Sequence, residues 1–209
     1  MRVIVHNAIS LDGKNTGFDI DLETYCGLIE QFGEDITLWG SGTVLQARME
    51  EDPDEPFTVP DPQPEDSKTA VAVVDSRGKV NCWKAIIDAG YWNKFYCLVS
   101  ESTHERYISK LEEIGVQVIV CGQHKVDLEL ALETLENEYG HKVCRLDSGG
   151  TLNGLMLDLG LVDEVSLMVC PVISDGMGES FAITKKMHNF KLKEGRPLKN
   201  GLVWLRYER

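Results

Sequence analysis

The most informative stretch of this sequence runs over residues 143–172, where an apolar segment ends in an acid, Asp147, and a glycine pair follows at Gly149 and Gly150. A helix is expected to open at Thr151, ahead of a second apolar strand. Glycines at a strand-to-helix turn let backbone N–H groups approach a ligand closely, and the first helical turn favours phosphate. The pattern predicts a nucleotide phosphate site, or, as the alternative, two glycines that only form a tight connection.

Other strand ends carry groups that could also do chemistry. Asp12 stands beside Gly13 in a turn after the first apolar strand, where an acid is more often a turn residue than a catalytic group. Gly42 and Thr43 follow the next strand and could turn backbone donors and a hydroxyl toward a ligand, although the third glycine of a dinucleotide fingerprint is absent. Ser76 places a small hydroxyl after a third apolar strand.

The sequence lacks the residues that zinc-dependent deamination, hydrolysis and metal binding require. The His-x-Glu and Pro-Cys-x-x-Cys strings that hold zinc in nucleobase deaminases do not occur, and neither does a Gly-x-Ser-x-Gly elbow. The five histidines show no metal-ligand spacing. We therefore expect no metal site and no hydrolase chemistry.

The elements that must position these residues alternate along the chain. Helical periodicity occurs at 22–32, 103–114 and 126–139, and a further helix is expected from residue 151. Strands alternating with helices predict an α/β sheet, and continuous apolar strands predict that helices cover both of its faces. An antiparallel pair is expected at the C-terminus, at 189–193 and 202–207. The other expected strands lie at 3–7, 36–39, 69–75, 94–99, 116–121, 142–147 and 164–171.

Length and composition favour one globular domain over residues 1–209. Residues 51–66 contain seven acids and no base, and five of the seven prolines fall in the same stretch, which excludes a regular helix or a central strand. We interpret 51–68 as an acidic, proline-rich loop within the domain. A linker between two domains is the alternative.

The net charge of −13 excludes nucleic acid and anionic membrane as partners, because the general field repels them. The sequence contains no apolar run long enough to span a bilayer and no secretory signal, so a cytoplasmic protein is expected. The six cysteines are widely spaced and contain no Cys-x-x-Cys pair, which indicates reduced thiols, mostly in the core.

In order along the chain, four motifs resemble one known family. They are Ala-x-Ser-Leu-Asp-Gly-Lys from Ala8, Gly-x-Gly-Thr-Val from Gly40, Val-Val-Asp-Ser from Val73, and Asp-Ser-Gly-Gly-Thr-Leu-Asn-Gly from Asp147. This series resembles the reductase domain of riboflavin biosynthesis, which is the C-terminal domain of the bifunctional pyrimidine deaminase/reductase and also exists as a stand-alone enzyme. The resemblance covers nearly the whole chain.

The resemblance implies a dihydrofolate-reductase-like three-layer α/β sandwich, with a mostly parallel central sheet and an antiparallel C-terminal strand pair. It also implies NADPH as hydride donor, a small-molecule substrate (a ribosylaminopyrimidine 5′-phosphate, reduced to the ribitylamino compound) and cytoplasmic homodimers. Asp12 and Asp147 would face the substrate. The implied cofactor-binding residues are Ala8, Gly42, Thr43, Ser76, Gly149, Gly150, Thr151, Leu152 and Asn153.

The sequence departs from the family mainly in its substrate features. Asp147 stands where the family usually has glutamate, and Gln31 lies where the resemblance implies a basic residue that meets the substrate phosphate. Lys14 and Arg48 are the alternative phosphate partners. A related reductase acting on a pterin or another imine or carbonyl is therefore a second hypothesis. A non-catalytic nucleotide-binding module is a third.

Overall fold

The computed structural model describes residues 1–60 and 69–209, which form two compact units. Unit 1 contains Met1 and residues 35–142, and unit 2 contains residues 2–34 and 143–209. The unit boundaries do not fall in the acidic segment. Residues 51–60 carry no helix or strand, and their neighbours in sequence on both sides belong to unit 1, whereas 61–68 lie outside the described residues. The single domain over 1–209 remains a prediction.

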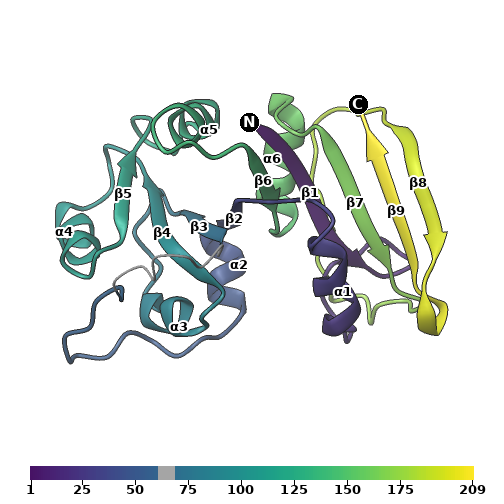
Figure 1. The fold of residues 1–209 in the computed structure, drawn as a ribbon, viewed down its shortest axis with the longest axis horizontal. Helices are drawn as coiled ribbons and strands as arrows, with labels where there is room; N and C mark the ends of the chain where they lie inside the picture. Colours follow the sequence, from purple (N-terminus) through teal and green to yellow (C-terminus); the bar gives the residue numbers. More distant parts are fainter. Residues whose placement is uncertain (61–68) are drawn as a thin grey trace. The chain divides into compact units, whose positions relative to one another are not determined.

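The helices and strands are most easily followed in chain order (Figure 1). They are β1 (Arg2–Ile9), α1 (Leu22–Ile29), β2 (Ile36–Gly40), α2 (Ser41–Gln46), β3 (Thr69–Val74), α3 (Trp83–Asp88), β4 (Trp92–Val99), α4 (Glu105–Glu113), β5 (Gln117–Val120), α5 (Leu128–Asn137), β6 (Val143–Leu146), α6 (Gly150–Leu159), β7 (Glu164–Val169), β8 (Lys191–Pro197), the 3-10 turn η1 (Lys199–Gly201) and β9 (Val203–Glu208).

Unit 1 contains parallel strands in the order β5-β4-β3-β2. One of its core clusters joins Val71 and Phe95 of the sheet to Trp83 of α3 and Leu111 of α4. Four consecutive residues of β3 are buried, as expected of a strand covered on both faces.

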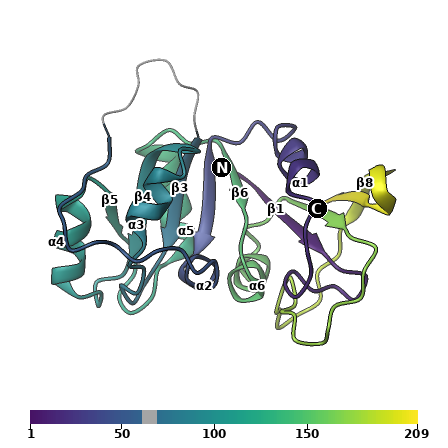
Figure 2. The same ribbon diagram turned by 90° about the horizontal axis from the view of Figure 1, so that it is seen from below.

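Unit 2 contains strands in the order β6-β1-β7-β9-β8, of which β6, β1 and β7 are parallel and β9 and β8 antiparallel. Helix α1 packs Leu28 against Ile4 and Ala8 of β1. Asn7 points to the other face of the sheet, where its side chain meets Asn153 of α6. The two helices of this unit therefore cover opposite faces of the sheet (Figure 2).

The structure confirms the predicted α/β class, the parallel strands and the antiparallel C-terminal pair. The nine strands found in residues 1–60 and 69–209 lie within a few residues of their expected positions, and α1, α4, α5 and α6 fall in the four segments expected to be helical. The six-residue helices α2 and α3 were not predicted. They are too short to show a helical period in the sequence.

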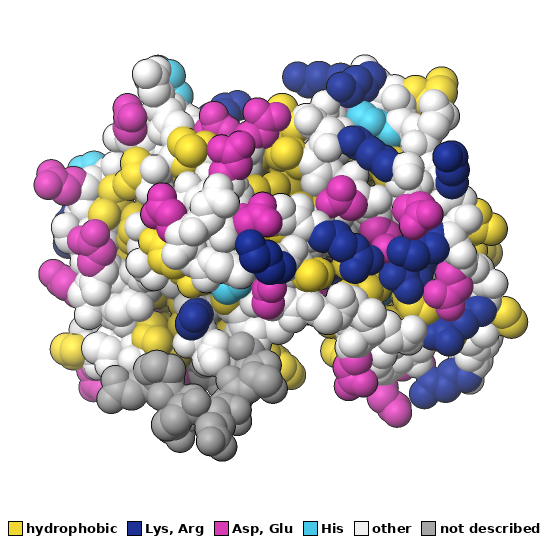
Figure 3. Space-filling model, turned by 45° about the horizontal axis from the view of Figure 1, so that its top comes forward, with side chains coloured by type: hydrophobic (Ala, Val, Ile, Leu, Met, Phe, Trp, Pro, Cys, Tyr) yellow, Lys and Arg dark blue, Asp and Glu magenta, His cyan; other side chains and the backbone are white. Residues whose placement is uncertain are grey.

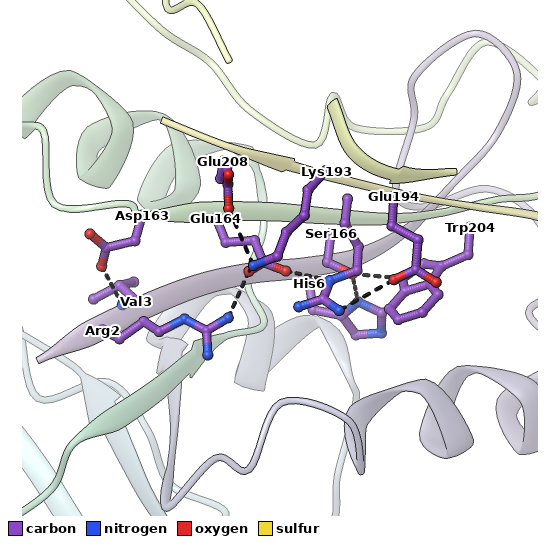
Figure 4. Close-up of polar contacts among 11 residues, drawn as sticks. Arg2, Val3, His6, Asp163, Glu164, Ser166, Lys193, Glu194, Trp204 and Glu208 are labelled. Atoms are coloured by element: carbon purple, nitrogen blue, oxygen red, sulfur yellow. Dashed lines mark hydrogen bonds and ion pairs between the residues drawn. The ribbon is translucent and has the colours of Figure 1, made fainter. Parts of the chain in front are cut away.

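A buried carboxylate anchors the C-terminal strands of unit 2. Glu164, at the start of β7, is 1% exposed and accepts hydrogen bonds from Arg2 Nη2 at 2.6 Å, Lys193 Nζ at 3.0 Å and Arg206 Nε at 2.5 Å. Figure 4 shows Arg2 of β1, which pairs with β7, and Lys193 of β8, which lies beyond β9, both reaching Glu164. Burial alone would raise the pKa of Glu164, but these three donors lower it. Basic side chains also gather over β8 and β9 on the surface shown in Figure 3.

Candidate functional site

The predicted strand, glycine loop and helix form one continuous segment of unit 2. Strand β6 ends at Leu146, and Asp147 and Ser148 lead to Gly149, which caps α6 in an extended conformation. No side chain caps this helix and its first turn contains no acid. The first N–H groups of a helix lack partners within the helix and favour anions. The start of α6 therefore suits a phosphate group.

Asp147 does not stand alone after the strand. Its Oδ2 accepts a hydrogen bond from Arg145 Nη1, and Arg145 Nε donates to Glu34 Oε2 from the chain that follows α1. The side chains of Arg145 and Glu34 are 7% and 8% exposed, whereas that of Asp147 is 26% exposed. Asp147 is thus the solvent-accessible end of a buried charged cluster.

Three further observations describe the electrostatics of this cluster. Burial would lower the pKa of Arg145, but Asp147 and Glu34 raise it above its ordinary value, so the guanidinium stays charged. The Tyr25 hydroxyl donates to the His6 backbone oxygen at 2.9 Å. Burial, followed by the charge of Asp147, raises the pKa of Tyr25 well above its usual range. Tyr25 is therefore neutral beside the carboxylate.

The glycines of α6 have a structural role of their own. A Cβ atom at Gly150 would lie 2.2 Å from the backbone oxygen of Ser180, and one at Gly154 would lie 1.9 Å from that of Ile183. The Ile183 N–H also donates to the Gly150 oxygen at 2.9 Å. The segment after β7 therefore crosses α6 at a distance that only glycine permits. This contact supports the tight-connection alternative for Gly150 and leaves the phosphate prediction for the loop as a proposal.

Asn153 lies within the same contact. Its side chain is fully buried, and Nδ2 donates to Asn7 Oδ1 at 2.8 Å, Ser148 O at 2.9 Å and Phe181 O at 2.7 Å. This amide joins β1, the glycine loop and the crossing segment. Any contribution of Asn153 to cofactor binding would act through the shape of the loop.

Asp12 is exposed in the turn after β1, and its carboxylate contacts Ser174. Oδ1 accepts from the Ser174 N–H at 3.0 Å and Oδ2 from the Ser174 hydroxyl at 2.9 Å. The backbone N–H of Ser174, aided by the hydroxyl of Ser10, lowers the pKa of Asp12 to about 2. Asp12 is ionised at neutral pH and carries no proton to donate.

The remaining candidates lie on both units. In unit 2, Ala8 is buried in the core cluster under α1, and Leu152 is buried in α6, whereas Thr151 is exposed in its first turn. In unit 1, Gly42 and Thr43 fall in the first turn of α2, and Ser76 Oγ accepts from the Val126 N–H at 2.9 Å. The assignment of these residues to the cofactor remains a prediction.

Sequence reasoning missed Arg145, Glu34 and Tyr25. Arg145 was detectable as a charged residue inside the apolar strand that leads to Asp147, because such a residue must be paired when it is buried. Glu34 and Tyr25 come from a distant segment and carry no such signal.

The structure also bears on metal sites, membrane-spanning helices and cysteines, for the residues that it describes. Residues 1–60 and 69–209 contain no group of three or more His, Cys, Asp or Glu side chains placed to hold a metal ion. No helix in those ranges is long and apolar enough to cross a membrane. All six cysteines are free thiols, and five are buried, while Cys26 is exposed.

The architecture defines the class first. The chain has the fold of a pyrimidine reductase-like protein from Corynebacterium diphtheriae, with a TM-score of 0.72 and 16% identity over 99% of this chain and 91% of that one. It also resembles dihydrofolate reductase from Enterococcus faecalis, with a TM-score of 0.57 and 10% identity over 100% and 96% of the two chains. This is the dihydrofolate-reductase-like fold.

The sequence then identifies the family. Residues 1–204 match the family model described as the RibD C-terminal domain, and the chain belongs to this family. It is similar to the 2,5-diamino-6-ribosylamino-4(3H)-pyrimidinone 5′-phosphate reductase of Methanothermobacter thermautotrophicus, with 41% identity over 78 residues. That similarity spans 37% of this chain and about a third of the relative, 35% of its length.

Proposed function

We propose that this protein is an NADPH-dependent reductase that converts a 5-amino-6-ribosylaminopyrimidine 5′-phosphate to its ribitylamino product. The observation that carries the proposal is the match of residues 1–204 to the family model. The similarity to a curated reductase of such a phosphate supports the substrate class.

The start of α6 fits the phosphates of the cofactor. The helix begins with Gly149 and Gly150, its first turn holds no acid, and the exposed Thr151 adds a hydroxyl. We propose that Leu152 and Asn153 complete this part of the site, and that Ala8, Gly42, Thr43 and Ser76 contribute elsewhere along the cofactor. When bound, NADPH supplies a hydride and leaves as NADP⁺.

The chain's own task is to handle charge at the reacting carbon. In the proposed substrate the ribose ring opens to an imine, and hydride adds to C1′ of the protonated imine to give the secondary amine. A fixed carboxylate stabilises the positive charge of that imine. Asp147 suits this task because its carboxylate is partly exposed and held from behind by Arg145.

Asp12 suits a different task. Its low pKa excludes it as a proton donor at neutral pH, and its two hydrogen bonds to Ser174 join the first turn to the segment after β7. We propose that Asp12 supports the substrate side of the site by shaping this turn.

The family also motivates two finer proposals. We propose that the protein is a homodimer, which sedimentation equilibrium tests, and that it acts in the cytoplasm, which imaging of a tagged chain tests. A monomer at micromolar concentration would contradict the first proposal.

A second candidate keeps the reductase class and changes the substrate to a pterin or another imine or carbonyl. It is favoured by the absence of a basic residue in the last turn of α1, where the sequence continues with Glu30 and Gln31. A phosphate partner would then have to come from Lys14 or Arg48, or the substrate would carry no phosphate.

Substrate comparison decides between these candidates. The purified protein is mixed with NADPH and the ribosylaminopyrimidine, with and without its 5′-phosphate, and products are identified by mass spectrometry. Preferred reduction of the phosphorylated compound supports the proposed function. Equal use of both forms favours the second candidate, and stoichiometric NADPH binding without turnover of any imine favours a non-catalytic module.

A further inference from the structure

Strand β6 contains a charge where its neighbours are apolar. Arg145 lies between Cys144 and Leu146, both fully buried, and is itself 6% exposed. A buried guanidinium is strongly unfavourable unless carboxylates pair with it. Its position two residues before Asp147 brings both side chains to the same face of the extended segment.

Arg145 forms ion pairs with two acids through different nitrogens of its guanidinium. Nε meets Glu34, which is nearly as buried, and Nη1 meets Asp147, which is the more exposed of the two acids. Glu34 fixes the planar guanidinium at one edge, so the other edge presents a fixed donor to Asp147. Together the three side chains carry one net negative charge, and its accessible part is the Asp147 carboxylate.

Two titratable groups beside this cluster, Tyr25 and His6, are both neutral. Tyr25 is neutral, because burial and the charge of Asp147 raise the pKa of its hydroxyl. Burial, aided by the charge of Arg145, lowers the pKa of His6 to about 3, so this imidazole is also neutral near pH 7. Neither Tyr25 nor His6 therefore offsets the charge of the Asp147 carboxylate.

We propose that Arg145 is a positioning residue which, anchored by Glu34, holds Asp147 as an oriented carboxylate for a substrate whose reacting carbon becomes cationic. This inference rests on the proposed function and narrows it. A carboxylate anion favours an iminium over a neutral carbonyl.

A double-mutant cycle on kcat tests the proposal. Asp147→Asn lowers kcat by about 10²-fold, and Arg145→Met lowers it at least tenfold. The Kd for NADPH changes little in either variant. Because Arg145 acts through Asp147, adding Arg145→Met to Asp147→Asn lowers kcat by less than about threefold more. Arg145→Lys keeps the charge and recovers part of the loss. If the loss of kcat in the double variant equalled the product of the two single losses, the proposal would be overturned.

Glu34→Gln tests the anchor and should reduce kcat less than Arg145→Met does, because Arg145 keeps its contact with Asp147. If Arg145→Met does not fold, the same cycle is run with Arg145→Lys. If Arg145→Lys lowered kcat by the same factor in the Asp147→Asn protein and in the wild type, the proposal would again be contradicted.

Arginine ¹⁵N NMR of the ligand-free protein measures the contact between Arg145 and Asp147 without any enzymatic turnover. Arg145 Nη signals, assigned by their loss in Arg145→Lys, should be protected from exchange, and Asp147→Ala, which removes the acceptor, should reduce this protection while the Nε signal persists. Unchanged Nη signals in Asp147→Ala would overturn the proposed contact. Protected signals in a protein that reduces no imine would instead contradict the proposed function.

Discussion

Replacing Gly154 with alanine should destabilise unit 2 through one defined collision. The added Cβ atom would lie 1.9 Å from the Ile183 carbonyl oxygen, 2.4 Å from its carbon and 2.8 Å from its nitrogen. All three are backbone atoms, so no side-chain rotation relieves the overlap. The crossing segment must retreat by roughly 1.5 Å to reach an ordinary contact distance.

The cost can be built from the contacts that this retreat breaks. The hydrogen bonds from Ile183 N to Gly150 O and from Asn153 Nδ2 to Phe181 O contribute about 1 kcal/mol each. Overpacking adds about 1–3 kcal/mol, and the helix propensity of alanine returns about 1 kcal/mol. We expect the free energy of unfolding to fall by about 2–4 kcal/mol.

Urea denaturation followed by far-ultraviolet circular dichroism measures this change. Gly27→Ala is the matched control, because Gly27 lies in α1 of the same unit and a Cβ there would meet nothing within 4 Å. This variant should be as stable as wild type or more stable by up to about 1 kcal/mol. If Gly154→Ala behaved like Gly27→Ala, the close crossing of α6 would be wrong.

Three further predictions concern charge. Glu164→Gln should lower the free energy of unfolding by about 2 kcal/mol, measured by urea denaturation, because three cations lose a buried partner; Glu208→Gln, on an exposed side chain, should change it by less than about 0.5 kcal/mol. His6 has a folded-state pKa of about 3, so the unfolded chain binds its proton first as pH falls below about 6.5. The free energy of unfolding should therefore fall by about 1.4 kcal/mol per pH unit between pH 6 and 4. His6→Phe should reduce this slope. An unchanged slope in His6→Phe would contradict the prediction. Asp12→Asn should lower kcat less than tenfold, against about 10²-fold for Asp147→Asn, and the reverse order would reject the assignment of roles.

The strands of this fold were predictable because each is a short apolar run bounded by turn residues. The segment 143–172 also revealed its strand, glycine loop and helix, since these lie consecutively in the sequence. Helices α2 and α3 were not predictable in the same way, because six residues make fewer than two turns and their buried side chains depend on packing within unit 1.

The candidate site was predictable only where its residues are local in sequence. Asp147 and the glycine pair could be found, but not the role of Gly150, whose closest neighbour is the Ser180 oxygen thirty residues later. The partners of Asp147 include Glu34, which is brought to β6 by tertiary structure. Contacts between segments so far apart leave no periodic signal in one sequence.

Transfer of deuteride from NADPH labelled at the nicotinamide C4 tests the central claim most directly. Incubated with the ribosylaminopyrimidine 5′-phosphate, the wild-type protein should yield a ribitylamino product with deuterium at C1′, in an amount equal to the NADPH consumed. Asp147→Asn should bind NADPH normally and form this product about 10²-fold more slowly. A folded wild-type protein that binds NADPH and transfers no deuterium to this substrate would contradict the account.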